Sequence, residues 1–128
     1  MSSVPQDEDW VAIVDDDEPI RRSLGRLFAL NGINVRTFCS AEDYLNRIGA
    51  SEPCCMVLDV QLGRLSGFDL QDRLRTEGRA PPIIFITALN EIPSAQLETR
   101  SGPAGYLRKP FDPQLLFDFV EAHVQPHR

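Results

Sequence analysis

The sequence has no apolar run that is long enough to cross a bilayer, and its first ten residues are polar and acidic. A transmembrane helix needs about 20 apolar residues, and a secretory signal needs an apolar stretch behind a basic start. Basic residues are also few, since 13 Lys and Arg stand against 19 Asp and Glu, for a formal net charge of -6. We therefore expect no membrane span and no direct binding to nucleic acid, whose phosphates require a basic surface.

Cysteine is scarce as well, and Cys39, Cys54 and Cys55 are the only three. An odd count without a Cys-x-x-Cys pair fits neither a disulfide framework nor a structural zinc site. We expect buried, reduced thiols in a cytoplasmic protein. The chain has 128 residues, 42% of them hydrophobic and 25% charged, which is enough for one globular domain with its own core.

Short apolar segments alternate with helical patterns along the chain. The predicted strands are residues 10–14, 33–38, 54–59, 83–86 and 104–107. The predicted helices run from Pro19 to a stop at Asn31-Gly32, from a cap at Ser40 to Ile48, from Gly67 to Glu77, from a cap at Asn90 to a stop at Gly102-Pro103, and from a cap at Asp112 through Val120. The third strand shows no polar alternation, so we expect helices over both of its faces.

This alternation, with short connections, predicts an α/β fold with a doubly wound, five-stranded parallel sheet flanked by five helices. We expect the flavodoxin-like strand order 2-1-3-4-5. Residues 9–124 would form this domain, with 1–8 as a flexible leader and 125–128 as a tail.

Polar residues stand at the ends of four of the predicted strands. Asp15 and Asp16 follow the first, Asp59 ends the third, Thr87 follows the fourth, and Lys109 follows the fifth. Because the carboxyl ends of parallel strands meet at one edge, we expect these side chains to converge. Three carboxylates would repel one another without a cation, and Mg²⁺ prefers carboxylate oxygens and water. The set predicts phosphoryl transfer, with Asp59 as the attacking carboxylate and Thr87 and Lys109 neutralising phosphoryl oxygens.

Each of these residues also has an ordinary structural interpretation. An acidic run such as Asp15–Glu18 is typical of a helix N-terminus, where it complements the helix dipole. Asp59 could cap the loop that follows it, Thr87 could cap the next helix, and a lysine before proline is usually solvated. Their joint placement at four strand ends favours a site.

Four segments together resemble the response-regulator receiver domain of bacterial two-component signalling. They are Val14-Asp15-Asp16-Asp17, Leu58-Asp59-Val60, Ile86-Thr87-Ala88 and Gly105-Tyr106-Leu107-Arg108-Lys109-Pro110-Phe111. The resemblance implies that a histidine kinase or a phosphotransfer protein phosphorylates Asp59. It implies a phosphoacceptor that assists its own phosphorylation and dephosphorylation, and not an enzyme with a separate substrate.

The resemblance also assigns roles to the other residues. Asp16 and Asp59 would bind Mg²⁺ (or Mn²⁺) directly, Asp15 largely through water, and the backbone carbonyl of Gln61 would complete the protein ligands. Thr87 and Tyr106 would form a conformational switch that controls an output partner, which the sequence does not name. The Lys109-Pro110 bond would be cis, and the fourth and fifth helices are a common dimer surface in the family.

The sequence departs from the family's pattern in three places. Gly63-Arg64 stands where the family commonly has Pro-Gly, so we expect a looser loop and, through Arg64, an altered kinase contact. Leu89 offers no acid or amide to orient a hydrolytic water, which predicts slow loss of the phosphoryl group. The fourth helix, with Pro93 near its start and Gly102 at its end, is expected to be short and mobile.

Alternative functions differ in what they require of the sequence. Residues 13–17 and 37–42 resemble receivers joined to a LuxR-type helix-turn-helix domain, so the chain is either a single-domain regulator or the receiver of a longer transcription factor. We favour the single-domain form because no linker follows residue 124. A haloacid-dehalogenase-like phosphatase would carry its nucleophile after the first strand, in an Asp-x-Asp pattern with Thr or Val beyond it. Here Pro19 and Ile20 follow the acidic run instead. A flavodoxin-like nucleotide binder would need glycines in the acidic first loop.

Overall fold

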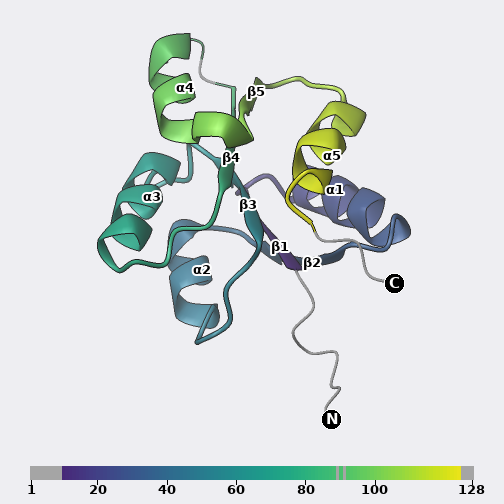
Figure 1. The fold of residues 1–128 in the computed structure, drawn as a ribbon, viewed down its shortest axis with the longest axis horizontal. Helices are drawn as coiled ribbons and strands as arrows, with labels where there is room; N and C mark the ends of the chain where they lie inside the picture. The colour runs from purple at the N-terminus through teal and green to yellow at the C-terminus, as the bar shows by residue number, and fades with distance from the viewer. Residues whose placement is uncertain (1–9, 89, 91, 125–128) are drawn as a thin grey trace.

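A parallel sheet of five strands forms the centre of the molecule, with helices against both faces (Figure 1). The computed structural model describes residues 10–88, 90 and 92–124. The strands are β1 (Trp10–Val14), β2 (Asn34–Phe38), β3 (Cys55–Asp59), β4 (Ile83–Thr87) and β5 (Tyr106–Arg108), in the order β2-β1-β3-β4-β5. Every neighbouring pair is parallel, which confirms the predicted sheet and strand order.

Helices on the two faces of the sheet enclose two separate apolar layers. The helices are α1 (Glu18–Leu30), α2 (Ala41–Arg47), α3 (Gly67–Thr76), α4 (Ser94–Ser101) and α5 (Pro113–Glu121), and a short 3-10 helix, η2 (Gly102–Ala104), follows α4. Figure 1 shows α1 and α5 on one face and α2, α3 and α4 on the other. All residues of β1, β3 and β4 are buried, because successive side chains enter alternate layers.

Local sequence explains where most helices begin. The side chains of Asp17, Ser40, Ser66 and Asp112 each accept a hydrogen bond from a backbone N–H in the first turn of the following helix. Ser66 and Asp69 form a reciprocal capping box at the start of α3. The caps predicted at Ser40 and Asp112 are therefore confirmed.

Two predicted boundaries around α4 are wrong. The cap is not Asn90, because α4 begins at Ser94 behind Pro93, which makes no side-chain cap bond. The residue before a proline is disfavoured in the helical conformation, which favours a helix start after Ile92 over one at Asn90. The last strand begins at Tyr106 and not at Ala104, since residues 102–104 form the 3-10 turn and Gly105, at φ 96, reverses the backbone first.

Some other predictions concern exposure or lie outside the described residues. Cys55 is buried as expected, but Cys54 is only half-buried and Cys39, which follows the edge strand β2, is exposed. The predicted leader, the tail and Leu89 lie outside the described residues. Within the described part of the chain, no helix has the length and apolar character needed to span a membrane.

Candidate functional site

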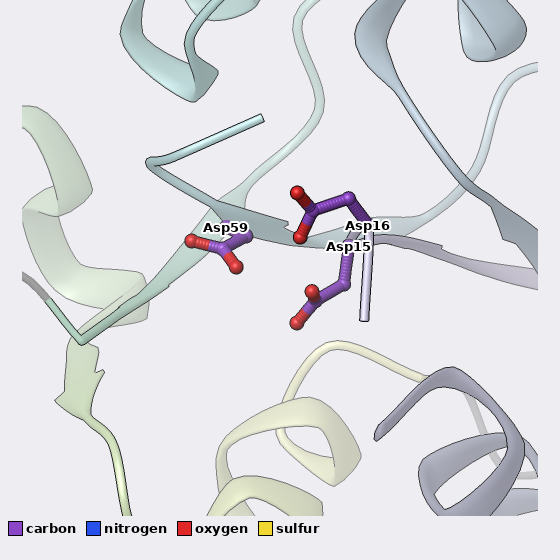
Figure 2. Close-up of side chains that lie close together, drawn as sticks. All are labelled: Asp15, Asp16 and Asp59. Carbon is purple, nitrogen blue, oxygen red and sulfur yellow. The ribbon is translucent and has the colours of Figure 1, made fainter. Parts of the chain in front are cut away.

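Three carboxylates gather at the carboxyl ends of β1 and β3. These strands are neighbours, and Val14 pairs with Leu58, so that Asp15 and Asp59 follow at adjacent positions. Asp15, Asp16 and Asp59 each place a carboxylate oxygen within 4.8 Å of the other two (Figure 2). Asp15 and Asp59 are buried, whereas Asp16 is exposed. The sheet thus brings together the three acidic residues that the sequence placed at its edge.

One ammonium group lies between the two buried carboxylates. Lys109 Nζ donates to Asp59 Oδ2 at 2.8 Å and to Asp15 Oδ2 at 3.0 Å. The backbone N–H of Lys109 donates to the Thr87 carbonyl at 2.8 Å, which ties the loop after β5 to the end of β4. The Lys109-Pro110 peptide bond is cis, as the resemblance implied. One lysine against three carboxylates leaves negative charge at the site, which suits a divalent cation.

Burial dominates the ionisation of Asp59. Loss of solvent raises the pKa of Asp59 to about 6, although the hydrogen bonds from Lys109 and from the Gln61 N–H act in the opposite direction. Burial alone would lower the pKa of Lys109, but its hydrogen bonds to Asp59 and Asp15 outweigh that effect and the pKa is raised. The Lys109 ammonium therefore stays charged, whereas burial disfavours the ionised form of Asp59.

The backbone around Asp59 is closely packed. Its Oδ1 accepts a hydrogen bond from the Gln61 N–H at 2.9 Å, and the Gly67 N–H donates to the Val60 carbonyl at 2.8 Å. A Cβ on Gly67 would collide with the Asp59 carbonyl oxygen, so only glycine allows α3 to start this close to the strand. Sequence reasoning missed this role of Gly67. The available signal was a glycine directly after Ser66, which already caps the helix.

The two residues of the expected switch lie on neighbouring strands. Thr87 is completely buried at the end of β4. Tyr106 is half-buried on β5, where it pairs with Phe85 and packs against the apolar layer that contains Leu97 of α4. The switch between two conformations stays a prediction, and so does the role of the Gln61 carbonyl as a ligand.

The loop between β3 and α3 explains part of the unusual Gly63-Arg64 pair. Gly63 has φ 88, which a proline could not adopt because its ring holds φ near about -65°. Leu62, next to it, is buried and anchors the loop to the core, while Arg64 is exposed. The backbone here therefore differs from what a proline at residue 63 would permit.

Comparison with known proteins gives a consistent family. The family model for the response regulator receiver domain matches residues 11–121. Nodulation protein W of Bradyrhizobium diazoefficiens is 40% identical over 118 residues, which are 92% of this chain and 52% of that protein. The C4-dicarboxylate transport transcriptional regulatory protein DctR of Rhodobacter capsulatus is 37% identical over 119 residues, which are 91% of this chain and 60% of that protein.

Solved structures agree with this result. The response regulator StyR superposes with a TM-score of 0.82 at 34% identity, over 92% of this chain and 60% of that one. The structure of FixJ-N gives 0.77 at 28% identity and covers 99% of this chain and all of its own. The chain belongs to the response regulator receiver domain family of two-component signalling, which replaces the haloacid-dehalogenase-like and nucleotide-binding alternatives. It spans only about half to 60% of the length of the curated relatives named here.

Proposed function

We propose that Asp59 accepts a phosphoryl group from the phosphohistidine of a histidine kinase or a phosphotransfer protein. The observation that carries this proposal is the buried Asp59 carboxylate, bonded to Lys109 and lying beside Asp15 and Asp16. A carboxylate oxygen of Asp59 attacks phosphorus, the P–N bond breaks, and the imidazole keeps the electron pair. The chain is then a cytoplasmic phosphoacceptor and not an enzyme with a separate substrate.

Mg²⁺, or Mn²⁺, fits the donor set at this site. Asp16 and Asp59 would hold it directly, Asp15 largely through water, and the Gln61 carbonyl would complete the protein ligands. The residual negative charge beside a single lysine supports this assignment. When bound, the ion supplies positive charge to the equatorial phosphoryl oxygens.

The other residues of the site hold and neutralise the phosphoryl group. In the unphosphorylated chain the Lys109 ammonium donates a hydrogen bond to Asp59 Oδ2, and after phosphorylation it would donate to a phosphoryl oxygen instead. The Thr87 hydroxyl would donate to a second oxygen, and the small side chain of Ala88 leaves room for the group. Loss of the phosphoryl group would be slow, because Leu89 offers no polar atom to orient water.

A movement of Thr87 would link phosphorylation to the binding of an output partner. Thr87 would shift towards the phosphoryl group, and Tyr106 would turn inward behind it. Tyr106 packs against the layer that holds Leu97, so its movement would reach α4. The face formed by α4, β5 and α5 would then bind an output protein or a second copy of the chain.

An apolar groove beside the site supports docking of the phosphoryl donor. The groove has a volume of about 460 Å³ and lies next to Lys109. Its lining includes Ile20 and Leu24 of α1 and Pro110 and Phe111 of the loop before α5. A donor helix placed there would bring its phosphohistidine close to Asp59.

Incubation with acetyl phosphate and Mg²⁺, followed by intact-mass measurement, tests the proposal. The native protein should gain one phosphoryl group, and Asp59→Asn should gain none. Asp118→Asn removes an exposed aspartate from α5 and should react like the native protein. An adduct on Asp59→Asn would show that another residue is the acceptor, and no adduct on the native protein would contradict phosphorylation itself.

A second candidate is that the chain is the receiver of a longer transcriptional regulator. The matched relatives include a transcriptional regulatory protein, and the chain covers 60% of its length. The output would then be DNA binding by another part of the same polypeptide. The length of the native open reading frame decides between this form and a single-domain regulator.

A further inference from the structure

Among the described residues, Arg21 is a second basic residue at the acidic cluster, and it contacts the backbone where Lys109 contacts carboxylates. Arg21, in α1, donates from Nη1 to the backbone carbonyl of Asp15 at 2.8 Å. Arg21 is half-buried, whereas the next arginine, Arg22, is exposed and pairs with Glu18 on its own helix. The helical pattern placed both arginines off the buried stripe, so the sequence did not distinguish them.

The carbonyl that Arg21 holds belongs to the peptide group between Asp15 and Asp16. Two further hydrogen bonds fix the same short loop. The Asp15 N–H donates to the Phe38 carbonyl at 3.1 Å, and the Asp17 N–H donates to Asp15 Oδ1 at 2.9 Å. With the Arg21 bond added, the plane of this peptide group is held from the helix side as well. The position of the Asp16 Cα therefore depends on Arg21.

Asp16 has little else to orient it. Its side chain is exposed, and in the described part of the chain no hydrogen bond holds its carboxylate. Its carboxylate nevertheless lies with those of Asp15 and Asp59. The backbone that carries Asp16 must therefore aim it.

We propose that Arg21 is a positioning residue that aims the Asp16 carboxylate at the cation site by holding the Asp15 carbonyl. This inference rests on the proposed function, since it concerns the same Mg²⁺ site. A positioning role and a purely electrostatic role of Arg21 predict opposite changes in Mg²⁺ affinity when Arg21 is replaced. A guanidinium close to a cation site repels the metal, so its removal would strengthen Mg²⁺ binding if charge were its main effect. Loss of a residue that orients a ligand instead weakens binding.

Calorimetric titration of the full chain with Mg²⁺ separates the two effects. Arg21→Gln should weaken Mg²⁺ binding by about tenfold, within the range seen when outer partners of metal ligands are removed. Arg22→Gln removes the same charge from the next residue of α1 and should change the affinity by less than about twofold, since exposed ion pairs contribute little. Equal or tighter binding by Arg21→Gln would overturn the proposal.

A double-mutant cycle tests the route through Asp16. In an Asp16→Asn background, Arg21→Gln should cause almost no further loss of Mg²⁺ affinity, because the carboxylate that it aims is gone. A merely structural effect of Arg21 would persist in that background and would contradict the proposal. If Arg21→Gln does not fold, Arg21→Lys decides: its shorter side chain keeps the charge without the reach of the guanidinium. Weaker binding by about threefold supports positioning, and unchanged binding overturns it.

Acetyl phosphate separates this inference from the proposed function. In Arg21→Gln, the Mg²⁺ concentration that gives half the maximal phosphorylation rate should rise about tenfold, while the rate at saturating Mg²⁺ stays within about twofold. A native protein that binds Mg²⁺ but is never phosphorylated would end the proposed function and leave the calorimetric result for Arg21 intact. If Asp59 is phosphorylated but Arg21→Gln shows a normal Mg²⁺ dependence, the proposed function stands and the inference about Arg21 fails.

Discussion

The acidic edge and helix α4 are held in place by different means. Asp15 and Asp59 are buried, and their carboxylates accept hydrogen bonds from the backbone and from Lys109. Helix α4 has eight residues, no side-chain cap at its start, and only Leu97 and Ser101 buried. The hydroxyl of Ser101 has no hydrogen-bond partner among the described residues, at a cost of about 1–3 kcal/mol.

Polar contacts of two arginines hold the ends of α4. One arginine, Arg100, belongs to the helix itself, and the other, Arg108, belongs to β5. Arg100 Nη1, near the end of the helix, donates to Asp72 at 2.8 Å and Gln71 at 3.0 Å on α3. Arg108 Nη2, on β5, donates to the carbonyl of Ile92 at 2.6 Å, just before the helix. Polar contacts of this kind at a half-exposed surface stabilise less than a packed apolar face.

From this difference we expect a signal to be generated at the acidic edge and received at α4. The acidic edge is closely fixed but electrostatically unfavourable, so a change of charge at Asp59 has a large effect on its energy. Helix α4 buries only two side chains, so we expect a small free energy to be enough to move it.

The largest expected effects come from cavities under the two helices. Leu116 of α5 and Leu97 of α4 are both completely buried. We expect Leu116→Ala to lower the free energy of unfolding by about 3–4 kcal/mol, and Leu97→Ala by only about 2 kcal/mol, because α4 can shift into the space. Urea unfolding monitored by circular dichroism measures both. Equal losses would show that α4 is as firmly packed as α5.

Stability without metal should depend on the ionisation of Asp59. The pKa of Asp59 is about 6 in the folded chain, against about 3.9 in an unfolded chain. The folded state thus binds the proton more tightly, and the contribution of Asp59 to stability falls as pH rises from about 4 to about 6. At pH 7.5 in a chelator, Asp59→Asn should be about 1–3 kcal/mol more stable than the native protein.

The pH series and added metal provide the controls for that prediction. Near pH 4 the two proteins should differ little, and Asp118→Asn should behave like the native protein throughout. Mg²⁺ should stabilise the native protein more than Asp59→Asn, because the variant lacks one of the three carboxylates. A variant that is less stable than the native protein at pH 7.5 without metal would show that the lost Lys109 bond outweighs burial.

Hydrogen exchange compares the two helices directly. Amides of α4 should exchange about 10–100 times faster than amides of α5, since α5 has a side-chain cap at Asp112 and buries Leu116, Phe117 and Val120. The measurement is amide exchange of the unphosphorylated protein, resolved by residue. Comparable protection in both helices would contradict the expected mobility of α4.

The smallest effect concerns the arginine at the end of α4. Arg100→Met keeps the apolar stem but removes the guanidinium and its contacts with Phe68, Gln71 and Asp72, and should cost about 1 kcal/mol. Faster exchange should appear in α4 and not in α5. Arg73→Met, which removes an exposed arginine paired with Glu77 on α3, should cost less than about 0.5 kcal/mol. Similar effects of the two substitutions would show that Arg100 is an ordinary surface arginine.

Much of the fold could be predicted because its signals are local. The run from Cys54 to Leu58 is apolar and is followed by Asp59, so the strand, its burial and its end could all be predicted from six residues, and the strand begins one residue later, at Cys55. A cap such as Ser40 accepts a hydrogen bond from a backbone N–H only three residues away, so the short sequence around it is enough to predict the cap. The start of α4 was missed because the cap signal of Asn90 conflicts with the restriction that Pro93 places on Ile92, and in the folded chain the proline sets the start.

The class of fold and the positions of Asp15, Asp16, Asp59 and Lys109 at strand ends could be predicted from the sequence alone. These predictions follow from apolar periods and from the common direction of parallel strands, whereas the order 2-1-3-4-5 was expected from the likeness to a flavodoxin-like sheet. Three other features are visible only in the folded chain: Arg21 and not Arg22 reaches the Asp15 carbonyl, Gly67 must lack a Cβ, and Arg100 joins α4 to α3. Such contacts depend on how elements distant in the chain approach one another, which no local pattern records.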